Sequence, residues 1–175
     1  MKEKIIRLAT SLAQQYGLNA FSYNDLAKEL GIAKASIHHY FPNKHDLAYE
    51  ILRLYILDFQ TQLLALEYLP ATEKLKGYLK IFSQVKTSSN KICLCLMYAA
   101  DLLSLEPRTQ QLVQDFFITN EAWLQTIFNQ DSAEIAQQKS QLLFSQLQGL
   151  LIRNRLLNND KSFLNLENLI LNLYQ

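Results

Sequence analysis

The chain has 175 residues, enough to bury a good core in one domain or in a small head on a larger body. Its formal net charge of +1 neither requires a nucleic-acid partner nor rules one out, so that case depends on local charge. Two mid-chain cysteines do not make a disulfide framework and are expected to be reduced. No uncharged stretch approaches a bilayer span and no signal-peptide core opens the chain, so we expect a cytoplasmic protein.

Only four Gly and three Pro interrupt a chain rich in helix-forming residues, which predicts an all-α fold. Apolar residues recur at helical spacing over 5–16, and Gly17 follows in the place of a left-handed cap, which predicts a first helix of about four turns. Ser22 and Asp25 have the spacing of a capping box that opens a second helix of about two turns. Gly31 then permits the positive φ of a tight turn.

A third short helix is predicted between Gly31 and Pro42, which terminates it. Ile37 and Phe41 are spaced to pack inward from this helix, so the three short helices share one small core. Asn43 is placed to cap a fourth, longer helix that runs to about residue 66.

The remainder of the chain shows one helical pattern after another and no strand pattern. Asp131, with Glu134 three residues later, is a plausible cap for one of these helices, and Pro107 is a plausible first residue of another. About nine helices are expected in all. Those beyond Pro70 are predicted at 72–86, 90–104, 107–129, 132–158 and 162–174.

A two-turn helix, a turn that begins at glycine and a second short helix form the pattern of a helix-turn-helix, whose second helix enters the DNA major groove. With Ile37 and Phe41 turned inward, six residues of that helix point outward, where they could reach phosphates or base edges. They are Lys34, Ala35, Ser36, His38, His39 and Tyr40. Lys44 stands at the start of the next helix, where its ammonium and the helix dipole could hold one phosphate together.

Residues 5–51 resemble the N-terminal domain of the TetR family of transcriptional regulators. Positions that match the family signature in order and spacing are Asp25, Leu26, Ala27, Gly31, Phe41, Lys44 and Leu47. The chain departs from the family pattern at Ala33, where Ser or Thr is common, and at His38 and Tyr40, where Tyr and His are frequent.

The resemblance implies which residues contact DNA and how the chain is divided. Ser22 and Tyr23 at the start of the second helix, Lys34 to Tyr40 in the third, and Lys44 are implied as DNA contacts. A helix-turn-helix domain is implied at 1–47, and a larger helical effector-binding and dimerisation domain at 48–175. Family members are homodimers whose last two helices form the interface, and apolar stripes over 132–158 and 162–174 fit that role.

Aromatic and sulfur-containing side chains on the fourth to seventh helices suit an apolar effector, although a plain helical core would need such side chains as well. These candidates are Tyr55, Phe59, Tyr78, Phe82, Cys93, Met97, Phe116, Phe117 and Trp123.

The two cysteines raise a separate question of thiol chemistry. Two positions apart on one helix, Cys93 and Cys95 would project to nearly opposite faces, so neither a bridge nor a dithiol enzyme is expected. If Asn90 caps that helix, Cys93 lies in the first turn beside Lys91, which favours a thiolate. The segment also resembles regulators with a Cys-Leu start to this helix, some of which sense electrophiles or oxidants. Sensing at Cys93 and an inert buried thiol both remain open.

Other functional classes find less support in the sequence. His38 and His39 are adjacent and point apart, and Pro42 breaks the helix before His45, so no metal site is expected. No cofactor motif and no catalytic constellation is present, so we expect no enzyme.

The sequence therefore predicts a dimeric regulator that binds palindromic double-stranded operator DNA. As is most common in the family, it is expected to be a repressor, released by a small apolar or electrophilic effector. The alternative is an effector-binding or protein-interaction module whose helix-turn-helix head no longer binds DNA.

Overall fold

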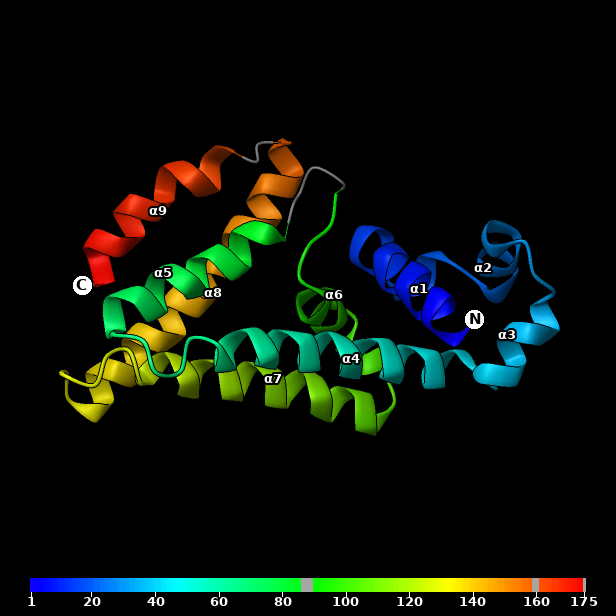
Figure 1. Cartoon of the computed structure of the whole chain (residues 1–175), viewed down its shortest axis with the longest axis horizontal. Helices are drawn as coiled ribbons and strands as arrows, with labels where there is room; N and C mark the ends of the chain where they lie inside the picture. Colours follow the sequence, from blue (N-terminus) through cyan, green and yellow to red (C-terminus); the bar gives the residue numbers. More distant parts are fainter. Residues whose placement is uncertain (86–89, 159–160, 175) are drawn as a thin grey trace. The chain divides into compact units, whose positions relative to one another are not determined.

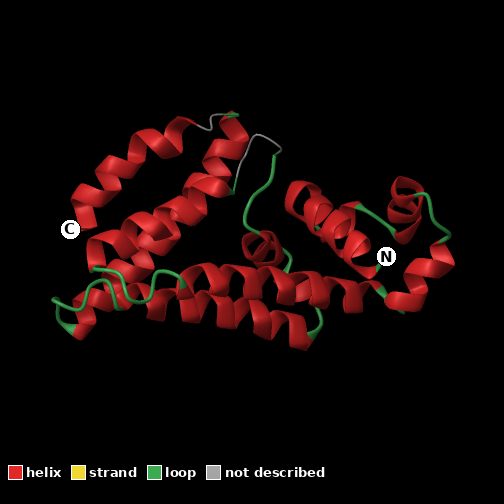
Figure 2. Cartoon of the chain, in the orientation of Figure 1, coloured by secondary structure: helices red, strands yellow, loops and turns green. Residues whose placement is uncertain are grey.

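The computed structural model describes residues 1–85, 90–158 and 161–174, and within them every regular element is a helix, as Figure 2 shows. The nine α-helices of these residues confirm the all-α fold (Figure 1). They are α1 (Lys2–Tyr16), α2 (Tyr23–Leu30), α3 (Lys34–Tyr40), α4 (Lys44–Leu64), α5 (Ala71–Gln84), α6 (Leu94–Ala100), α7 (Pro107–Gln125), α8 (Ala133–Leu157) and α9 (Lys161–Tyr174). Two 3-10 turns, η1 (Leu18–Ala20) and η3 (Leu102–Ser104), connect some of them.

The residues pack into two compact units. The first comprises Met1–Leu57 and Cys93–Gln114, and the second comprises Asp58–Ile92 and Asp115–Gln175. Helices α4 and α7 contribute residues to both units. This division follows packing, and the functional boundary after residue 47 stays a prediction.

The start of the first unit is a three-helix head in which α1 contacts α2 and α3. Its core is built from one apolar face of each helix, with Ile5, Leu26 and Ile37 fully buried. Burial of such side chains, each worth about 1.5–3 kcal/mol, stabilises helices that are too short to persist alone. The helix-turn-helix pattern expected from the sequence is therefore formed by α2 and α3.

Local signals set the ends of α2 as predicted. The Ser22 hydroxyl accepts a hydrogen bond from the Asp25 amide (3.4 Å), and the Asp25 carboxylate accepts one from the Ser22 amide (2.7 Å). Gly31 ends the helix in the left-handed conformation, with φ of 65° and ψ of 34°. The expectation for Gly17 was wrong in part, because its φ of 93° is positive but its ψ of 161° lies outside the left-handed helical region.

Two later helix starts differ from the sequence predictions. Asn90 does not cap α6, because it has a φ of 56° and the helix begins only at Leu94, immediately after Cys93. The Ser132 hydroxyl accepts a hydrogen bond from the Ile135 amide (3.4 Å) and so caps α8. The predicted cap at Asp131 is therefore wrong. The end of the helix predicted at 72–86 falls partly outside the described residues.

The second unit has an aromatic and aliphatic core formed by α5, α8 and the parts of α4 and α7 that belong to it. Tyr78, Phe116 and Phe144 are almost completely buried there, and the Tyr78 hydroxyl donates to the buried amide oxygen of Asn120 (2.9 Å). Across the described ranges, we find no helix long and apolar enough to cross a lipid bilayer.

The capping box of α2 yields a test of the head. Replacing Ser22 by Ala removes the acceptor of the Asp25 amide and should lower the free energy of unfolding by about 1 kcal/mol. Ser22→Thr keeps a capping hydroxyl and should retain most of the stability. Urea denaturation of both variants gives the comparison, and equal losses in the two would mean that the hydroxyl is not the stabilising group.

Candidate functional site

Helix α3 turns a single residue into the core of the head and leaves the others accessible. Ile37 is fully buried, and Phe41, just beyond the helix, is also buried. Of the six predicted contact residues, five are exposed and Ser36 is half-buried: Lys34, Ala35, Ser36, His38, His39 and Tyr40. None of them is acidic, so the outer face of α3 presents donors and cationic groups without a carboxylate.

Hydrogen bonding and ring contacts orient the histidine side chains of this face. The His38 Nδ1 lies 3.2 Å from the Pro42 carbonyl oxygen, and since a carbonyl can only accept, Nδ1 is the protonated nitrogen of that bond. This leaves Nε2 of His38 for an external partner. The His38 ring also packs edge-on against Tyr23, with centroids 4.8 Å apart, and His39 packs edge-on against Tyr40 at 5.2 Å.

Tyr23, another predicted DNA contact, has a side chain that is engaged within the head. Its side chain is only 6% exposed, and its hydroxyl lies 3.0 Å from the Phe41 carbonyl oxygen and 2.5 Å from that of Asn43. Burial, reinforced by the nearby Asp46 carboxylate, raises the pKa of Tyr23 to about 12, so the hydroxyl stays a donor. Tyr23 thus anchors the turn between α3 and α4.

Lys44 lies in the first turn of α4 and is half-buried. Its ammonium donates to the Phe21 carbonyl oxygen and lies 4.8 Å from the centroid of the Phe21 ring. Burial lowers the pKa of Lys44, while the Asp25 charge acts in the opposite direction. An ammonium has three donors, so the bond to Phe21 leaves two for an external acceptor.

Two carboxylates of the first unit, those of Asp25 and Asp46, are engaged by partners within the protein. Asp25 Oδ2 accepts a bond from the Ser22 hydroxyl (2.7 Å), and this bond is the main cause that lowers the pKa of Asp25. The Asp46 carboxylate accepts from the Arg108 guanidinium at 2.5 Å. Ser22, another predicted contact, is exposed although its hydroxyl serves the capping box. The link between Asp46 and Arg108 spans 62 positions and has no signal in the sequence.

The nine predicted effector-binding residues divide between the two units. Tyr55, Cys93 and Met97 belong to the first unit. The other six belong to the second unit and are Phe59, Tyr78, Phe82, Phe116, Phe117 and Trp123. Within the second unit these rings pack in a continuous cluster around Phe59, whose centroid lies 5.2–6.3 Å from three of them.

Ligand pockets are commonly about 300–1,000 Å³ in volume. A cavity of about 310 Å³, near the lower end of that range, opens beside this cluster. Its lining comprises Phe59, Gln60, Leu63, Leu64, Glu67, Phe116, Thr119, Asn120 and Trp123. The indole N–H of Trp123 donates to the Glu67 carboxylate at 3.1 Å, which places a polar pair beside apolar walls. Three of the predicted effector residues therefore meet at one cavity, together with polar groups that the sequence did not single out.

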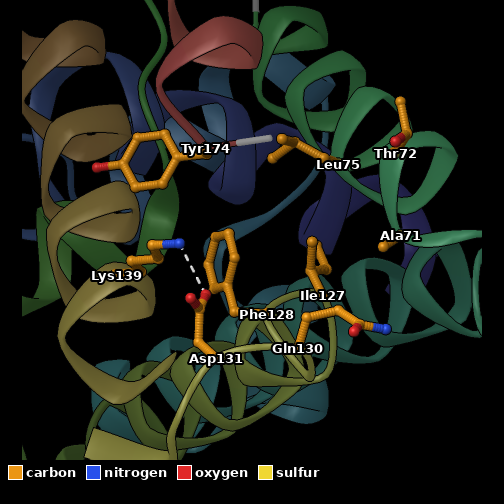
Figure 3. A pocket seen from close by; sticks show the side chains of 9 residues that line it. All are labelled: Ala71, Thr72, Leu75, Ile127, Phe128, Gln130, Asp131, Lys139 and Tyr174. Atoms are coloured by element: carbon orange, nitrogen blue, oxygen red, sulfur yellow. Dashed lines mark hydrogen bonds and ion pairs between the residues drawn. The ribbon is translucent and has the colours of Figure 1, made fainter. Parts of the chain in front are cut away.

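A second cavity of about 280 Å³ in the same unit contains none of the predicted residues (Figure 3). Ala71 and Thr72 from the start of α5 lie on one side of it in Figure 3, and an ion pair between Lys139 and Asp131 (2.7 Å) lies on another. Tyr174 also lines it, and its hydroxyl donates to Gln146 at 2.9 Å. The sequence offers no signal for this cavity, because its lining comes from segments that are distant along the chain.

The cysteines lie closer together than the sequence indicated. Because Cys93 precedes α6 with a non-helical backbone (φ of −50° and ψ of 126°), its sulfur does not follow the helical spacing, and the Cys95 thiol donates a hydrogen bond to it. The expectation that the two side chains project apart is therefore wrong. Among the residues whose placement is given, no cluster of three or more His, Cys, Asp or Glu side chains could hold a metal ion.

Comparison with known proteins places this geometry in a family. The sequence model for bacterial regulatory proteins of the tetR family matches residues 5–51. An uncharacterised HTH-type transcriptional regulator of Bacillus subtilis, YxaF, is 44% identical over 50 residues, which cover 28% of this chain and only 26% of that protein.

Solved structures match over nearly the whole chain. A TetR transcriptional regulator from Legionella pneumophila is 30% identical, with a TM-score of 0.90 over 99% of this chain and 96% of that one. A TetR-family regulator from Agrobacterium tumefaciens has the same fold at 23% identity, with a TM-score of 0.87 over 97% and 95% of the two chains. The chain therefore belongs to the TetR family of transcriptional regulators.

Proposed function

We propose that this regulator is a cytoplasmic homodimeric repressor, which binds palindromic operator DNA through α3 and is released by a small apolar or electrophilic effector. The observation that carries the proposal is the outer face of α3, which has no acidic residue and is held outward by the burial of Ile37 and Phe41. A purely structural bundle would not need such a face.

The proposed interface divides into positioning and reading groups. Lys44, at the N-terminus of a long helix, is suited to a phosphate, because its charge and the helix dipole both favour an anion. Lys34, Ala35 and Ser36 open α3, and their short or flexible side chains would let the backbone approach the bases. His39 and Tyr40 would donate to base edges or phosphates further along the helix.

The cavity beside Phe59 is the proposed effector site. Its walls are mainly apolar, while Asn120, Thr119 and the Glu67 carboxylate supply polar groups that could orient a ligand. Helix α4 carries both Lys44 and Phe59. A ligand that shifts α4 would therefore move Lys44 and change how the head is placed against DNA. A coupling free energy of about 1–3 kcal/mol would make a useful switch.

Apolar side chains on α8 and α9 support the proposed dimer. A groove of about 290 Å³ between them is lined by Gln146, Gly149, Leu150, Arg153, Leu166, Leu169, Ile170 and Leu173. Leu156 on α8 and Leu173 on α9 are 75% and 61% exposed. Contiguous exposed apolar surface commonly marks an interface with a partner, whereas single exposed leucines do not. A twofold dimer would place two copies of α3 against the two half-sites of a palindrome.

The proposed DNA contacts can be separated by their dependence on sequence and salt. Lys44→Gln keeps a donor for the Phe21 carbonyl but removes the positive charge. The affinity should therefore fall for every duplex. The slope of the logarithm of the binding constant against the logarithm of the salt concentration should decrease in magnitude by about 1. His39→Ala should instead weaken the free energy of operator binding by about 1–3 kcal/mol and relax the preference for one base at a single position of the operator. Gel retardation on operator and mutated operator, at several salt concentrations, measures both effects.

Lys80→Ala, an exposed lysine of the second unit, is the control and should leave binding unchanged. Equal losses in Lys80→Ala and Lys44→Gln would contradict the assigned interface. If the unmodified protein causes only salt-sensitive smearing and no specific retardation, the chain is an effector-binding or interaction module.

Two tyrosine variants should show opposite behaviour. Tyr23→Phe removes the hydroxyl that bonds buried carbonyls and should lower the free energy of unfolding by about 1–2 kcal/mol, with unchanged DNA affinity while the protein remains folded. Tyr40→Phe removes an exposed hydroxyl, so it should weaken DNA binding and leave stability within about 0.5 kcal/mol. Denaturation curves and binding isotherms test the pair, and a Tyr23→Phe protein that folds normally but binds weakly would return Tyr23 to the interface.

Dimerisation through α8 and α9 can be tested with a charge. Leu173→Asp would bury a carboxylate in the proposed interface and should raise the dimer dissociation constant at least about a hundredfold. Leu103→Asp is the control, because Leu103 is 95% exposed in η3 of the first unit and should tolerate the charge. Sedimentation velocity distinguishes the species, and a Leu173→Asp protein that remains fully dimeric would place the interface elsewhere.

A further inference from the structure

The first unit contains a small sulfur cluster that the proposed DNA and effector sites do not use. Cys93 and Cys95 are both buried, with Cys93 only 3% exposed. Cys95 lies in the first turn of α6, and Cys93 is the residue immediately before that helix. The hydroxyl of Tyr55, on α4, is bonded to the Cys93 sulfur. Three polar side chains from two helical segments therefore meet in an otherwise apolar environment.

The hydrogen bonds in this cluster favour one thiolate. The bond donated by the Cys95 thiol, assisted by that from Tyr55, lowers the pKa of Cys93 to about 7 despite its burial. Burial, together with its bond to Cys93, raises the pKa of Cys95 well above its ordinary value. The pair therefore loses one proton readily and holds the second, which is the arrangement of a nucleophilic thiolate beside a resolving thiol.

The backbone permits a bond between the two sulfurs. Residues two positions apart have Cα atoms no more than about 7 Å apart, close to the upper end of the range that disulfides span. The hydrogen bond between the two side chains requires that the Cys93 and Cys95 sulfurs face each other. Because a disulfide that closes so short a loop stores strain, it would be easily reduced, as regulatory disulfides are.

We propose that hydrogen peroxide converts Cys93 and Cys95 into a reversible disulfide, and that this bond displaces α6 and weakens DNA binding. The second half of this inference rests on the proposed function, whereas the first half concerns only the two thiols.

The chemistry balances in two steps. The Cys93 thiolate attacks one peroxide oxygen, the O–O bond breaks, and the product is a sulfenic acid with release of hydroxide. The Cys95 sulfur then attacks the sulfenic sulfur, an S–S bond forms, and the Cys95 proton leaves with the second hydroxide as water. Overall, two thiols and one hydrogen peroxide give one disulfide and two waters, so peroxide is the only oxidant required.

Burial of the pair selects among oxidants by size. Hydrogen peroxide is only slightly larger than water, so brief opening of the surroundings admits it. Bulky alkylating agents or glutathione disulfide would need a much larger opening. The site is therefore better suited to a small peroxide than to a large electrophile.

Contacts within the first unit connect α6 to the head. The Tyr98 hydroxyl of α6 donates to the Ala48 carbonyl oxygen of α4 at 3.2 Å. Helix α6 also contacts α1, where the Met97 methyl carbon lies 3.5 Å from the position of a Cβ on Gly17. The first turn of α6 is closed by a bond from the Met97 amide to the Cys93 carbonyl oxygen (3.1 Å). Movement of Cys93 toward Cys95 would strain this turn and disturb both contacts.

The test uses the full chain and hydrogen peroxide. After brief oxidation, denaturation and alkylation, trypsin should release residues 92–108 as one peptide that contains both cysteines. The mass of the oxidised peptide should be lower than that of the reduced peptide by two hydrogens, and treatment with dithiothreitol should restore the reduced mass. A sulfoxide at Met97 would instead add the mass of one oxygen. The oxidation rate should rise with pH up to about 7 and then level off, because the thiolate is the nucleophile. Tyr55→Phe, which loses one donor, should shift this profile to higher pH.

DNA affinity is measured on the same samples. Oxidised protein should bind operator about tenfold more weakly than reduced protein, and dithiothreitol should restore the affinity. Cys93→Ala and Cys95→Ala, which cannot form the bond, should keep their affinity in peroxide. Persistent free thiols, oxidation only to sulfinic acid, or disulfides between chains would overturn the proposed site.

Failure of this inference can be told apart from failure of the proposed function. A disulfide that forms without a change in affinity would overturn the regulatory half alone. If reduced protein fails to bind any operator, the proposed function fails, and the peptide mass still decides whether the thiol pair is oxidised.

Discussion

The DNA-facing geometry depends on how a helix of seven residues is held, because α3 is too short to be stable alone. Burial of Ile37 and Phe41 fixes which side faces the core, and the Tyr23 hydroxyl lies within hydrogen-bonding distance of the Phe41 and Asn43 carbonyl oxygens, just beyond the helix. Every other residue of α3 is then exposed to solvent or half-buried. The buried Tyr23 side chain therefore helps to hold the face of α3 that is proposed to contact DNA.

Local charge explains how a chain with a net charge of +1 can present a surface suited to a polyanion. The two carboxylates near the face are bound by partners in their own unit, Asp25 by Ser22 and Asp46 by Arg108. Arg108 also lies over the ring of Tyr49, with its guanidinium carbon 4.9 Å from the centroid. The Asp46 charge is thus balanced by Arg108, whereas the Asp25 carboxylate keeps its charge and acts on Lys44.

Much of the fold followed from local sequence patterns, and the differences arise where distant residues decide. Apolar periodicity located the helices, and the capping box at Ser22 and the left-handed turn at Gly31 formed as expected because each involves only a few neighbouring residues. Burial of Tyr23 and the late start of α6 at Leu94 depend on packing against other segments, which one-dimensional periodicity does not contain. The assumption of a continuous helix through Cys93 made the two thiols point apart, whereas the non-helical backbone before Leu94 brings them within hydrogen-bonding reach.

The most direct test of the central claim is selection of bound sites from random duplex DNA by the purified full chain. If the outer face of α3 reads bases in a dimer, the selected sequences should share an inverted repeat, with half-site centres one helical turn, about 10–10.5 base pairs, or a multiple of it apart. Recovery of no enriched sequence, under salt conditions in which the protein is folded, would contradict the claim that α3 recognises DNA.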